Sequence, residues 1–191
     1  MKVLGLLGSP RRGGNSEILL DLALAGAAAT GAKVEKVVPS ESHIIPCDGC
    51  RHCSDTPGHC HYRDDMDYLY RRFREVDRFL IVSPLFFLGL PAPLKAMVDR
   101  CQALWVIKYE QNGQVGLSGQ PRLGFFLSSA HYDRPRFFRP AEATARSFYT
   151  SLDVRHIGSS FYGNIDLKGE VVGHPTALEE AYAVGQRLGM P

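Results

Sequence analysis

The sequence has no long hydrophobic run and little net charge. No stretch approaches the ~20 consecutive apolar residues that a membrane-spanning helix needs, so no membrane partner is expected. Lys and Arg number 22 against 20 Asp and Glu, a formal net charge of +2 at pH 7, which gives no electrostatic reason to expect a nucleic-acid partner. The first apolar run stops at Gly8-Ser9-Pro10 and is shorter than the core of a secretory signal. We therefore expect a cytoplasmic protein.

The chain also lacks internal repeats, low-complexity tracts and a linker between domains. Its 191 residues suit a single domain. Hydrophobic residues make up 45% and charged residues 22%, as in an ordinary globular protein. We expect one domain over residues 1–191, with its least structured insertions at 39–63 and 107–121.

What the sequence does contain is a regular alternation of strands and helices. Apolar or alternating segments predict strands at 3–7, 33–38, 78–83, 122–128 and 154–159. Apolar-faced segments of helix formers predict helices at 16–29, 66–76, 92–106, 140–152 and 175–188. This alternation implies a parallel sheet with right-handed crossovers. Five such units predict an α/β fold, a flavodoxin-like three-layer α/β/α sandwich with a five-stranded parallel sheet in the order 2-1-3-4-5.

The turn after the first strand has the features of a phosphate-binding loop. It reads GSPRRGGNS, residues 8–16, and its glycines let the backbone curl. The helix that follows offers free N–H groups and the positive end of its dipole. Ser9, Asn15 and Ser16 add neutral donors, and Arg11 adds a charge. The loop is neither a Walker A motif nor G-x-G-x-x-G, and a strand-to-helix turn without a ligand is the alternative.

Two segments together resemble the NADPH-dependent FMN reductase and iron–sulfur flavoprotein branch of the flavodoxin superfamily. GSPRRGGNS resembles the phosphate loop of that branch, and SPLFFLGLPAPLKAMVDR, residues 83–100, resembles its segment after strand three. Gly163-Asn164 and residues 168–170 resemble its segment after strand five. The resemblance implies FMN as cofactor. The residues implied for its phosphate are Ser9, Arg11, Asn15 and Ser16.

The resemblance also implies a flavin-ring site after strands three and four. The expected ring contacts are Pro84, Leu85, Phe86, Phe87 and Leu88. Ser128 and Ser129 are small enough for a flat ring to approach, and His131 is able to donate a hydrogen bond to flavin or substrate. Ordinary core lining is the alternative for 85–88, and solvent exposure is the alternative for His131.

Four of the five cysteines lie close together after strand two. They are Cys47, Cys50, Cys53 and Cys60. Clustered cysteines in a reducing compartment favour metal or redox chemistry over structural disulfides, and x2 spacing lets successive thiolates reach a common centre. The resemblance implies a [4Fe–4S] cluster beside FMN. A metal-free thiol loop and a tetrathiolate zinc site stay open as alternatives, whereas the fifth, Cys101, is expected to be a small buried hydrophobe.

Together these features predict an FMN-dependent oxidoreductase. NADH, NADPH or a reduced carrier would donate electrons, which leave to a small-molecule redox substrate or an electron-carrier protein, through the cluster if one is bound. No acid–base residue stands out, so none is assigned a catalytic role. The alternative is a flavin-binding electron-transfer or redox-sensing protein with little turnover of its own. The apolar segment 85–106 favours self-association, and the resemblance implies a homodimer or homotetramer.

Overall fold

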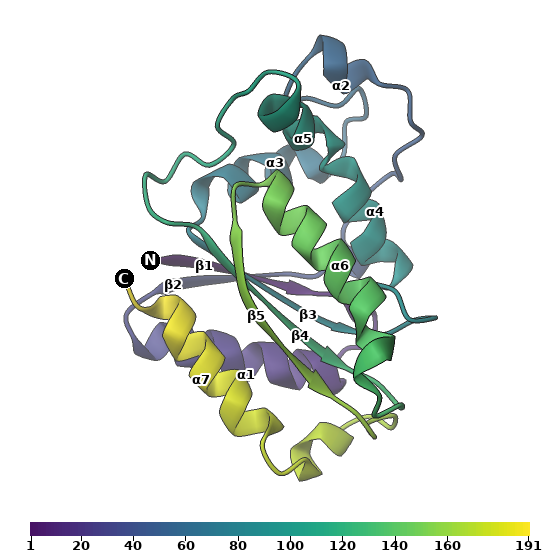
Figure 1. Ribbon diagram of the computed structural model, residues 1–191, viewed down its shortest axis with the longest axis vertical. Helices are drawn as coiled ribbons and strands as arrows, with labels where there is room; N and C mark the ends of the chain where they lie inside the picture. The colour runs from purple at the N-terminus through teal and green to yellow at the C-terminus, as the bar shows by residue number, and fades with distance from the viewer.

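Five parallel strands form one sheet in the order β2-β1-β3-β4-β5 in the computed structural model, which describes residues 1–191 (Figure 1). The strands are β1 (Lys2–Leu7), β2 (Lys33–Val37), β3 (Arg78–Pro84), β4 (Leu123–Ser129) and β5 (Arg155–Tyr162). The predicted fold class and strand order are confirmed. Strand β5 ends at Tyr162 rather than at the predicted 159, because its last residues pair with β4 as far as Ser129.

Helices cover both faces of the sheet and make the two outer layers. They are α1 (Asn15–Ala29), α2 (His52–Asp55), α3 (Met66–Glu75), α4 (Ala92–Arg100), α5 (Gln102–Tyr109), α6 (Pro135–Ser151) and α7 (Ala177–Gly189), with 3-10 turns η1 (Pro39–Glu41) and η2 (Glu170–Gly173). Helices α1 and α7 lie side by side on one face, and α3 to α6 lie on the other (Figure 1). None of the helices combines the length and apolarity required to cross a lipid bilayer.

Each face of the sheet has its own hydrophobic core. In β3, Phe79 and Ile81 pack in the core under α3 to α6, whereas Leu80 and Val82 pack in the core under α1 and α7. Successive side chains of a strand point to opposite faces, so a sheet covered on both faces needs an uninterrupted apolar run. This is why the central strands could be recognised from the sequence.

The helix predicted over 92–106 is two helices in the structure. Helix α4 ends at Arg100 and α5 begins at Gln102, because the N–H of Cys101 bonds the carbonyl of Val98 and the chain tightens into a single turn there. Cys101 is buried, and burial raises the pKa of its thiol, as for the inert buried cysteine that was expected.

Helix α6 begins at Pro135 rather than at Pro140. Proline is favoured at the first helical position, and Pro135 occupies that position, which leaves Pro140 inside the helix. The earlier start buries Phe138, whose ring stacks on that of Phe161 with centroids 4.7 Å apart. The segment that follows β4 is therefore short and leads directly into helix.

Candidate functional site

A cleft of about 360 Å³ lies beyond the carboxyl ends of the strands. Loops that follow β1, β3, β4 and β5 form its walls. Its lining residues are Ser9, Arg11, Gly14, Asn15, Ser16, Pro84, Leu85, Phe86, Phe87, Leu88, Ser129, Ala130, His131, Tyr132, Ile165, Asp166 and Lys168. The adjacent strands β1 and β3 lead to helices on opposite faces of the sheet, so the cleft lies at the topological switch point, where ligands of such sheets bind.

Of the predicted cofactor residues, only Ser128 does not line the cleft. Ser128 is fully buried, and its hydroxyl donates to the carbonyl oxygen of Ser83 at 2.8 Å. Neighbouring residues of a strand face opposite sides, so Ser129, the next residue, reaches the cleft and Ser128 does not.

The first turn of α1 closes one end of the cleft with unused hydrogen-bond donors. The backbone N–H groups of Asn15 and Ser16 have no acceptor within the chain. The hydroxyl of Ser16 also has no partner, although the residue is only 2% exposed, while the hydroxyl of Ser9 accepts the N–H of Arg11 at 3.1 Å. The first N–H groups of a helix lack partners within the helix, and where they face a cleft they offer a place for an anion.

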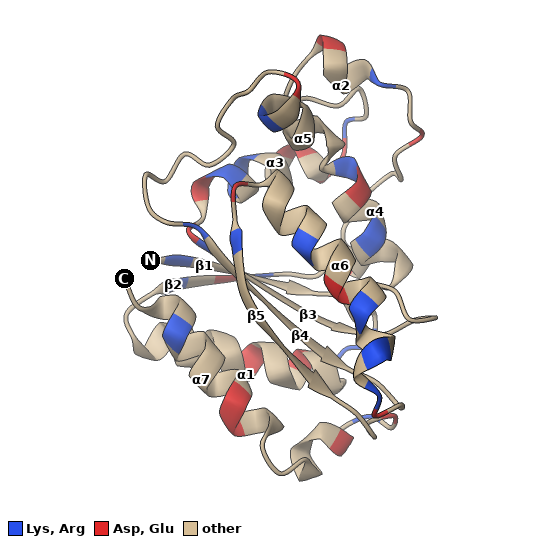
Figure 2. Cartoon of the chain, in the orientation of Figure 1, with Lys and Arg blue, Asp and Glu red and all other residues tan.

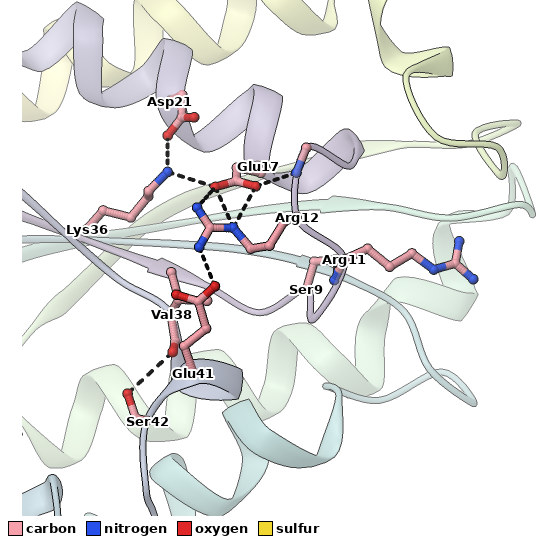
Figure 3. Close-up of polar contacts among 10 residues, drawn as sticks. Ser9, Arg11, Arg12, Glu17, Asp21, Lys36, Val38, Glu41 and Ser42 are labelled. Carbon is pink, nitrogen blue, oxygen red and sulfur yellow. Dashed lines mark hydrogen bonds and ion pairs between the residues drawn. The ribbon is translucent and has the colours of Figure 1, made fainter.

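Behind this loop, a charge network fixes its shape (Figure 3). The carboxylate of Glu17 accepts the N–H of Gly13 at 2.5 Å and the Nε of Arg12 at 3.0 Å. Lys36 on β2 reaches the same carboxylate at 2.9 Å, and Arg12 also pairs with Glu41 of η1. The Arg12 guanidinium first, and then the Gly13 N–H and Lys36, hold the pKa of Glu17 at about 2, although burial acts to raise it.

This network separates the two arginines of the loop. Arg12 turns toward Glu17 and Glu41, whereas Arg11 extends to the opposite side (Figure 3) and lines the cleft. The charge of Arg12 is therefore balanced within the protein, and Arg11 remains available for a ligand.

Asn15 lines the cleft, but its side chain is already engaged. Its Nδ2 donates to the carbonyl of Leu167 at 2.8 Å, and its Oδ1 accepts the N–H groups of Gly169 at 2.9 Å and Val171 at 3.2 Å. The side chain thus fastens the segment after β5 to the start of α1. Only the backbone N–H of Asn15 is free for the phosphate contact predicted from the sequence.

The other end of the cleft has an apolar wall on a strained turn. Phe86 and Gly89 exchange two N–H···O bonds, each 3.0 Å long. Between them, Phe87 (φ 49°) and Leu88 (φ 65°) both adopt the left-handed conformation, which costs roughly 1–2 kcal/mol for each residue with a Cβ. Phe87 is fully exposed and Phe86 is 44% exposed. Core lining, the alternative for this segment, is therefore wrong for Phe86 to Leu88.

The wall that follows β5 and Tyr132, the residue beside His131, were not predicted from the sequence. Ile165, Asp166 and Lys168 line the cleft, as does Tyr132. His131 is exposed, and its Nδ1 lies 3.7 Å from the carboxylate of Asp166. The resemblance of residues 168–170 to the family's segment after strand five was the one signal in the sequence that pointed to this wall, but it did not assign a role to any of those residues.

A second cavity, of about 540 Å³, contains all four clustered cysteines. It lies where the loop after η1, with the short helix α2, passes over α4 and α5 (Figure 1). The lining residues are Cys47, Asp48, Gly49, Cys50, Arg51, Cys53, Ser54, Cys60, Tyr62, Asp99, Arg100, Gln102, Ala103, Trp105 and Glu110. We call it the cysteine cavity; it shares no lining residue with the cleft.

The four thiols differ in their surroundings and form no disulfide. Cys47 and Cys50 are exposed, while Cys53 and Cys60 are half-buried against the core. Burial raises the pKa of Cys53, and the neighbouring thiols add to the effect. The Sγ of Cys50 lies 3.3 Å from Nδ1 of His61.

A buried ion pair fastens the base of the cysteine loop. Nη1 of Arg100 lies 2.6 Å from the carboxylate of Asp64, and these side chains are 1% and 0% exposed. The same carboxylate accepts the N–H groups of Ile45 at 2.9 Å and Met66 at 3.0 Å, and Arg100 donates to the carbonyl of Ile45 at 2.6 Å. The pair therefore joins α4 to the chain on both sides of the cysteines.

Asp64 and Asp65, which lie just before α3, each accept a backbone N–H group. Asp64 accepts the N–H of Met66 at the start of the helix. Asp65, which occupies the cap position, instead accepts the N–H of His43 at 2.7 Å. Both carboxylates therefore hold the cysteine loop against α3.

A five-stranded parallel sheet in this order, with helices on both faces and a cleft at the switch point, defines a flavodoxin-like class of protein. The chain belongs to the NADPH-dependent FMN reductase family, whose model matches residues 1–131. The family resemblance seen in the sequence is thereby confirmed.

Two curated relatives match about half to three fifths of the chain. An iron–sulfur flavoprotein of Archaeoglobus fulgidus is 43% identical over 100 residues, which are 52% of this chain and 45% of the relative. An iron–sulfur flavoprotein of Methanocaldococcus jannaschii is 35% identical over 116 residues, 61% of this chain and 59% of the relative. The chain thus spans about half the length of these relatives.

Solved structures match over the whole chain at low identity. An NAD(P)H:quinone oxidoreductase from Methanothermobacter marburgensis has a TM-score of 0.70 at 17% identity, covering 100% of this chain and 98% of that one. An FMN-dependent NADH-azoreductase from Bacillus anthracis, solved with FMN, has a TM-score of 0.70 at 14% identity, with 100% of both chains covered. These likenesses establish the shared fold.

Proposed function

We propose that the cleft binds FMN and that the protein is an NAD(P)H-dependent oxidoreductase. One observation carries the proposal: the Ser16 hydroxyl and two backbone N–H groups have no partner within the chain at one end of a cleft whose other end is an exposed apolar wall. The phosphate of FMN would accept hydrogen bonds from the donors at the first end, and its flat ring would lie along Pro84 to Leu88 at the other. The names of the family and of the azoreductase solved with FMN support the same cofactor.

The residues present fit FMN without rearrangement of the loop. Ser9, Ser16 and the start of α1 supply neutral donors, and Arg11 supplies a positive charge. A Cβ added to Gly14 would lie 3.1 Å from the carbonyl oxygen of Arg11, so a side chain there would crowd the cradle. When bound, FMN accepts two electrons and releases them together or singly.

The chain's own part in the reaction is to position, shield and select. The wall from Pro84 to Leu88 keeps water from one side of the cleft, and Ser129 leaves room for a flat ring on the other. His131 is able to donate a hydrogen bond to the flavin or to a substrate. We assign no residue as a proton donor or acceptor.

We further propose that Cys47, Cys50, Cys53 and Cys60 hold a [4Fe–4S] cluster, which would supply one-electron transfer. Four thiols that line a single cavity are the donor set that such a cluster requires. The relatives named iron–sulfur flavoproteins support this assignment over zinc. A loop of free thiols is the remaining alternative, and metal analysis separates the three.

For the electron donor, we propose NADH, NADPH or a reduced carrier, with a small-molecule redox substrate or a carrier protein as acceptor. Figure 2 shows basic residues along α6, whose first turns follow the cleft residue Tyr132. Arg134, Arg136 and Arg139 there form no ion pair, so their charge favours an anionic nucleotide or an acidic protein.

The exposed Phe86 to Leu88 turn supports self-association as a homodimer or homotetramer, which light scattering would measure.

An electron-transfer or redox-sensing protein with little turnover is the second candidate, and the exposed Cys47 and Cys50 favour it. The test is FMN titration of the purified protein, followed by steady-state NAD(P)H oxidation with a quinone acceptor. We expect saturable FMN binding and turnover that depends on FMN. Binding without turnover would favour the carrier, and the absence of FMN binding would refute the proposal.

A further inference from the structure

We propose that Lys168 is the second cation of the FMN phosphate site and that Asn15 places it there. The inference rests on the proposed FMN site and adds a residue from the far end of the chain to it. A Cβ added to Gly13 would lie 3.2 Å from the Nζ of Lys168. The ammonium group therefore lies against the backbone of the phosphate loop, although the two residues are far apart in sequence.

The position of Lys168 is built by the surrounding turn. The three hydrogen bonds of the Asn15 side chain hold Leu167, Gly169 and Val171 at the first turn of α1. The turn is closed from within as well, since the carboxylate of Glu170 accepts the N–H groups of Asp166 at 2.6 Å and Leu167 at 2.7 Å.

Gly169 allows this turn to form. Its φ of +87° is a conformation that glycine adopts without steric cost. The backbone on both sides of Lys168 is thus fixed, so that only the side chain is free to move.

A bound phosphate would need a second positively charged side chain at this end of the cleft to balance its charge. A phosphate monoester carries about −1.5 to −2 charges near pH 7. Arg12 is balanced by Glu17 and Glu41, which leaves Arg11 and Lys168 as the only Arg or Lys side chains that line the cleft. Neither forms an ion pair with a carboxylate of the chain.

The acidic residue nearest to Lys168 in the lining is directed elsewhere. The carboxylate of Asp166 lies 3.7 Å from Nδ1 of His131, and both side chains are exposed. The other carboxylate of the turn, Glu170, accepts two backbone N–H groups, and these hydrogen bonds lower its pKa. Lys168 therefore has no internal counter-ion, and the phosphate of FMN supplies one.

Comparing FMN with riboflavin isolates this contribution, because riboflavin has the same ring without the phosphate. The full chain, freed of flavin by dialysis, is titrated with each ligand, and quenching of flavin fluorescence reports binding. We expect Lys168→Gln to raise the Kd for FMN by about tenfold, as for loss of one charge-assisted contact, and to leave the Kd for riboflavin unchanged. Lys168→Arg should retain most of the affinity for FMN.

The matched control is Lys33→Gln, which removes an exposed lysine of β2 outside the cleft and should change neither Kd. Asn15→Ala should weaken FMN binding as much as Lys168→Gln, and the double variant should be no weaker than either single variant, because both act through the same ammonium group. Hydrogen exchange over residues 165–171 should accelerate in Asn15→Ala alone.

The possible failures are distinguishable. If the wild-type chain does not bind FMN, or binds it no more tightly than riboflavin, the proposed phosphate site is wrong and this inference falls with it. If the wild type prefers FMN and Lys168→Gln keeps that preference within twofold, the inference alone is overturned. If Lys168→Gln weakened the binding of FMN and of riboflavin equally, the inference would also be overturned, since that result would indicate a lysine that only supports the structure.

Discussion

The cleft and the cysteine cavity are fixed to the protein in different ways. Every wall of the cleft begins where a strand of the sheet ends, and Glu17 and Asn15 tie the walls to α1. The cysteine cavity is formed by a loop with one short helix, and the Asp64–Arg100 pair joins both ends of that loop to α4. The cleft therefore takes its geometry from the sheet, whereas the cavity depends on a few polar contacts.

This difference has a consequence for how each region tolerates change. Segments with few buried apolar contacts open at lower free energy than the core, and the cysteine loop has only a few partly buried members against the core. We expect perturbations at the loop base to leave the cleft intact, and perturbations behind the phosphate loop to leave the cysteines in place. Asp64→Asn and Glu17→Gln test this separation, and Phe87→Asn tests the strain in the apolar wall of the cleft.

The largest effect is expected from Asp64→Asn. Loss of the carboxylate leaves the buried Arg100 without a counter-ion, and removing one partner of a buried pair costs about 3–5 kcal/mol. Urea unfolding should show a loss of about 3 kcal/mol, and hydrogen exchange should accelerate over residues 43–66. The affinity for FMN should stay within twofold of wild type.

Asp67→Asn is the matched control for that substitution. Its carboxylate is 45% exposed and lies 3.7 Å from Arg63, and such surface pairs contribute about 0–1 kcal/mol. If Asp64→Asn proves no more destabilising than Asp67→Asn, or if it abolishes FMN binding, the cysteine loop is not held as described.

An intermediate effect, dependent on pH, is expected from Glu17→Gln. The pKa of Glu17 in the folded protein is about 2, below its ordinary value near 4.3. A depressed carboxyl pKa stabilises the folded state fully above the ordinary value, and this contribution is lost as the pH falls toward 2. The variant should be about 2 kcal/mol less stable at pH 7, and the difference should shrink below pH 4.5.

Urea unfolding of the wild type and of Glu17→Gln between pH 7 and pH 2 measures how the difference in their free energies of unfolding shrinks. Glu17→Gln should also weaken FMN binding, because a neutral amide replaces the charged acceptor of the Gly13 N–H and of Arg12, while hydrogen exchange of the cysteine loop stays unchanged. Glu41→Gln, which removes an exposed partner of Arg12, should cost less than about 1 kcal/mol. A constant difference across the pH range would contradict the role given to Glu17.

The smallest effect on stability is expected from Phe87→Asn. Phe87 is fully exposed at φ 49°, so the substitution removes no packing and introduces a residue that tolerates this conformation. Asn112 and Asn164 already occupy such positions, at φ 51° and 54°. We expect a gain of about 0.5 kcal/mol in urea unfolding together with weaker FMN binding. Destabilisation would mean that the turn is not strained.

The sheet and most of the cleft could be predicted because both depend on local sequence. Buried strands read as uninterrupted apolar runs, and each loop of the cleft directly follows such a run. Ser9, Arg11, Ser16 and the segment from Pro84 to Leu88 were therefore placed by counting from a strand end. Of the adjacent residues Ser128 and Ser129, both expected at the ring, only Ser129 lines the cleft, because successive side chains of a strand face opposite sides.

What the sequence did not reveal depends on contacts between distant segments. Lys168 reaches Gly13 only in the folded chain, and the likeness of residues 168–170 to the family's segment does not by itself indicate that approach. The part that the Asn15 side chain plays in holding residues 167–171 was not predicted for the same reason, since its acceptor and donors lie in that distant segment. The Asp64–Arg100 pair likewise joins two motifs that were recognised separately.

The most direct test of the account measures bound FMN and bound iron together, in anaerobically purified protein. Two proteins are compared: the wild type, and a variant in which all four clustered cysteines, Cys47, Cys50, Cys53 and Cys60, are changed to serine. The wild type should bind FMN together with about four iron atoms per chain. The variant should lose the iron and keep the FMN, because the two cavities share no residue. Loss of FMN together with the iron, or a wild type that binds neither, would contradict the account.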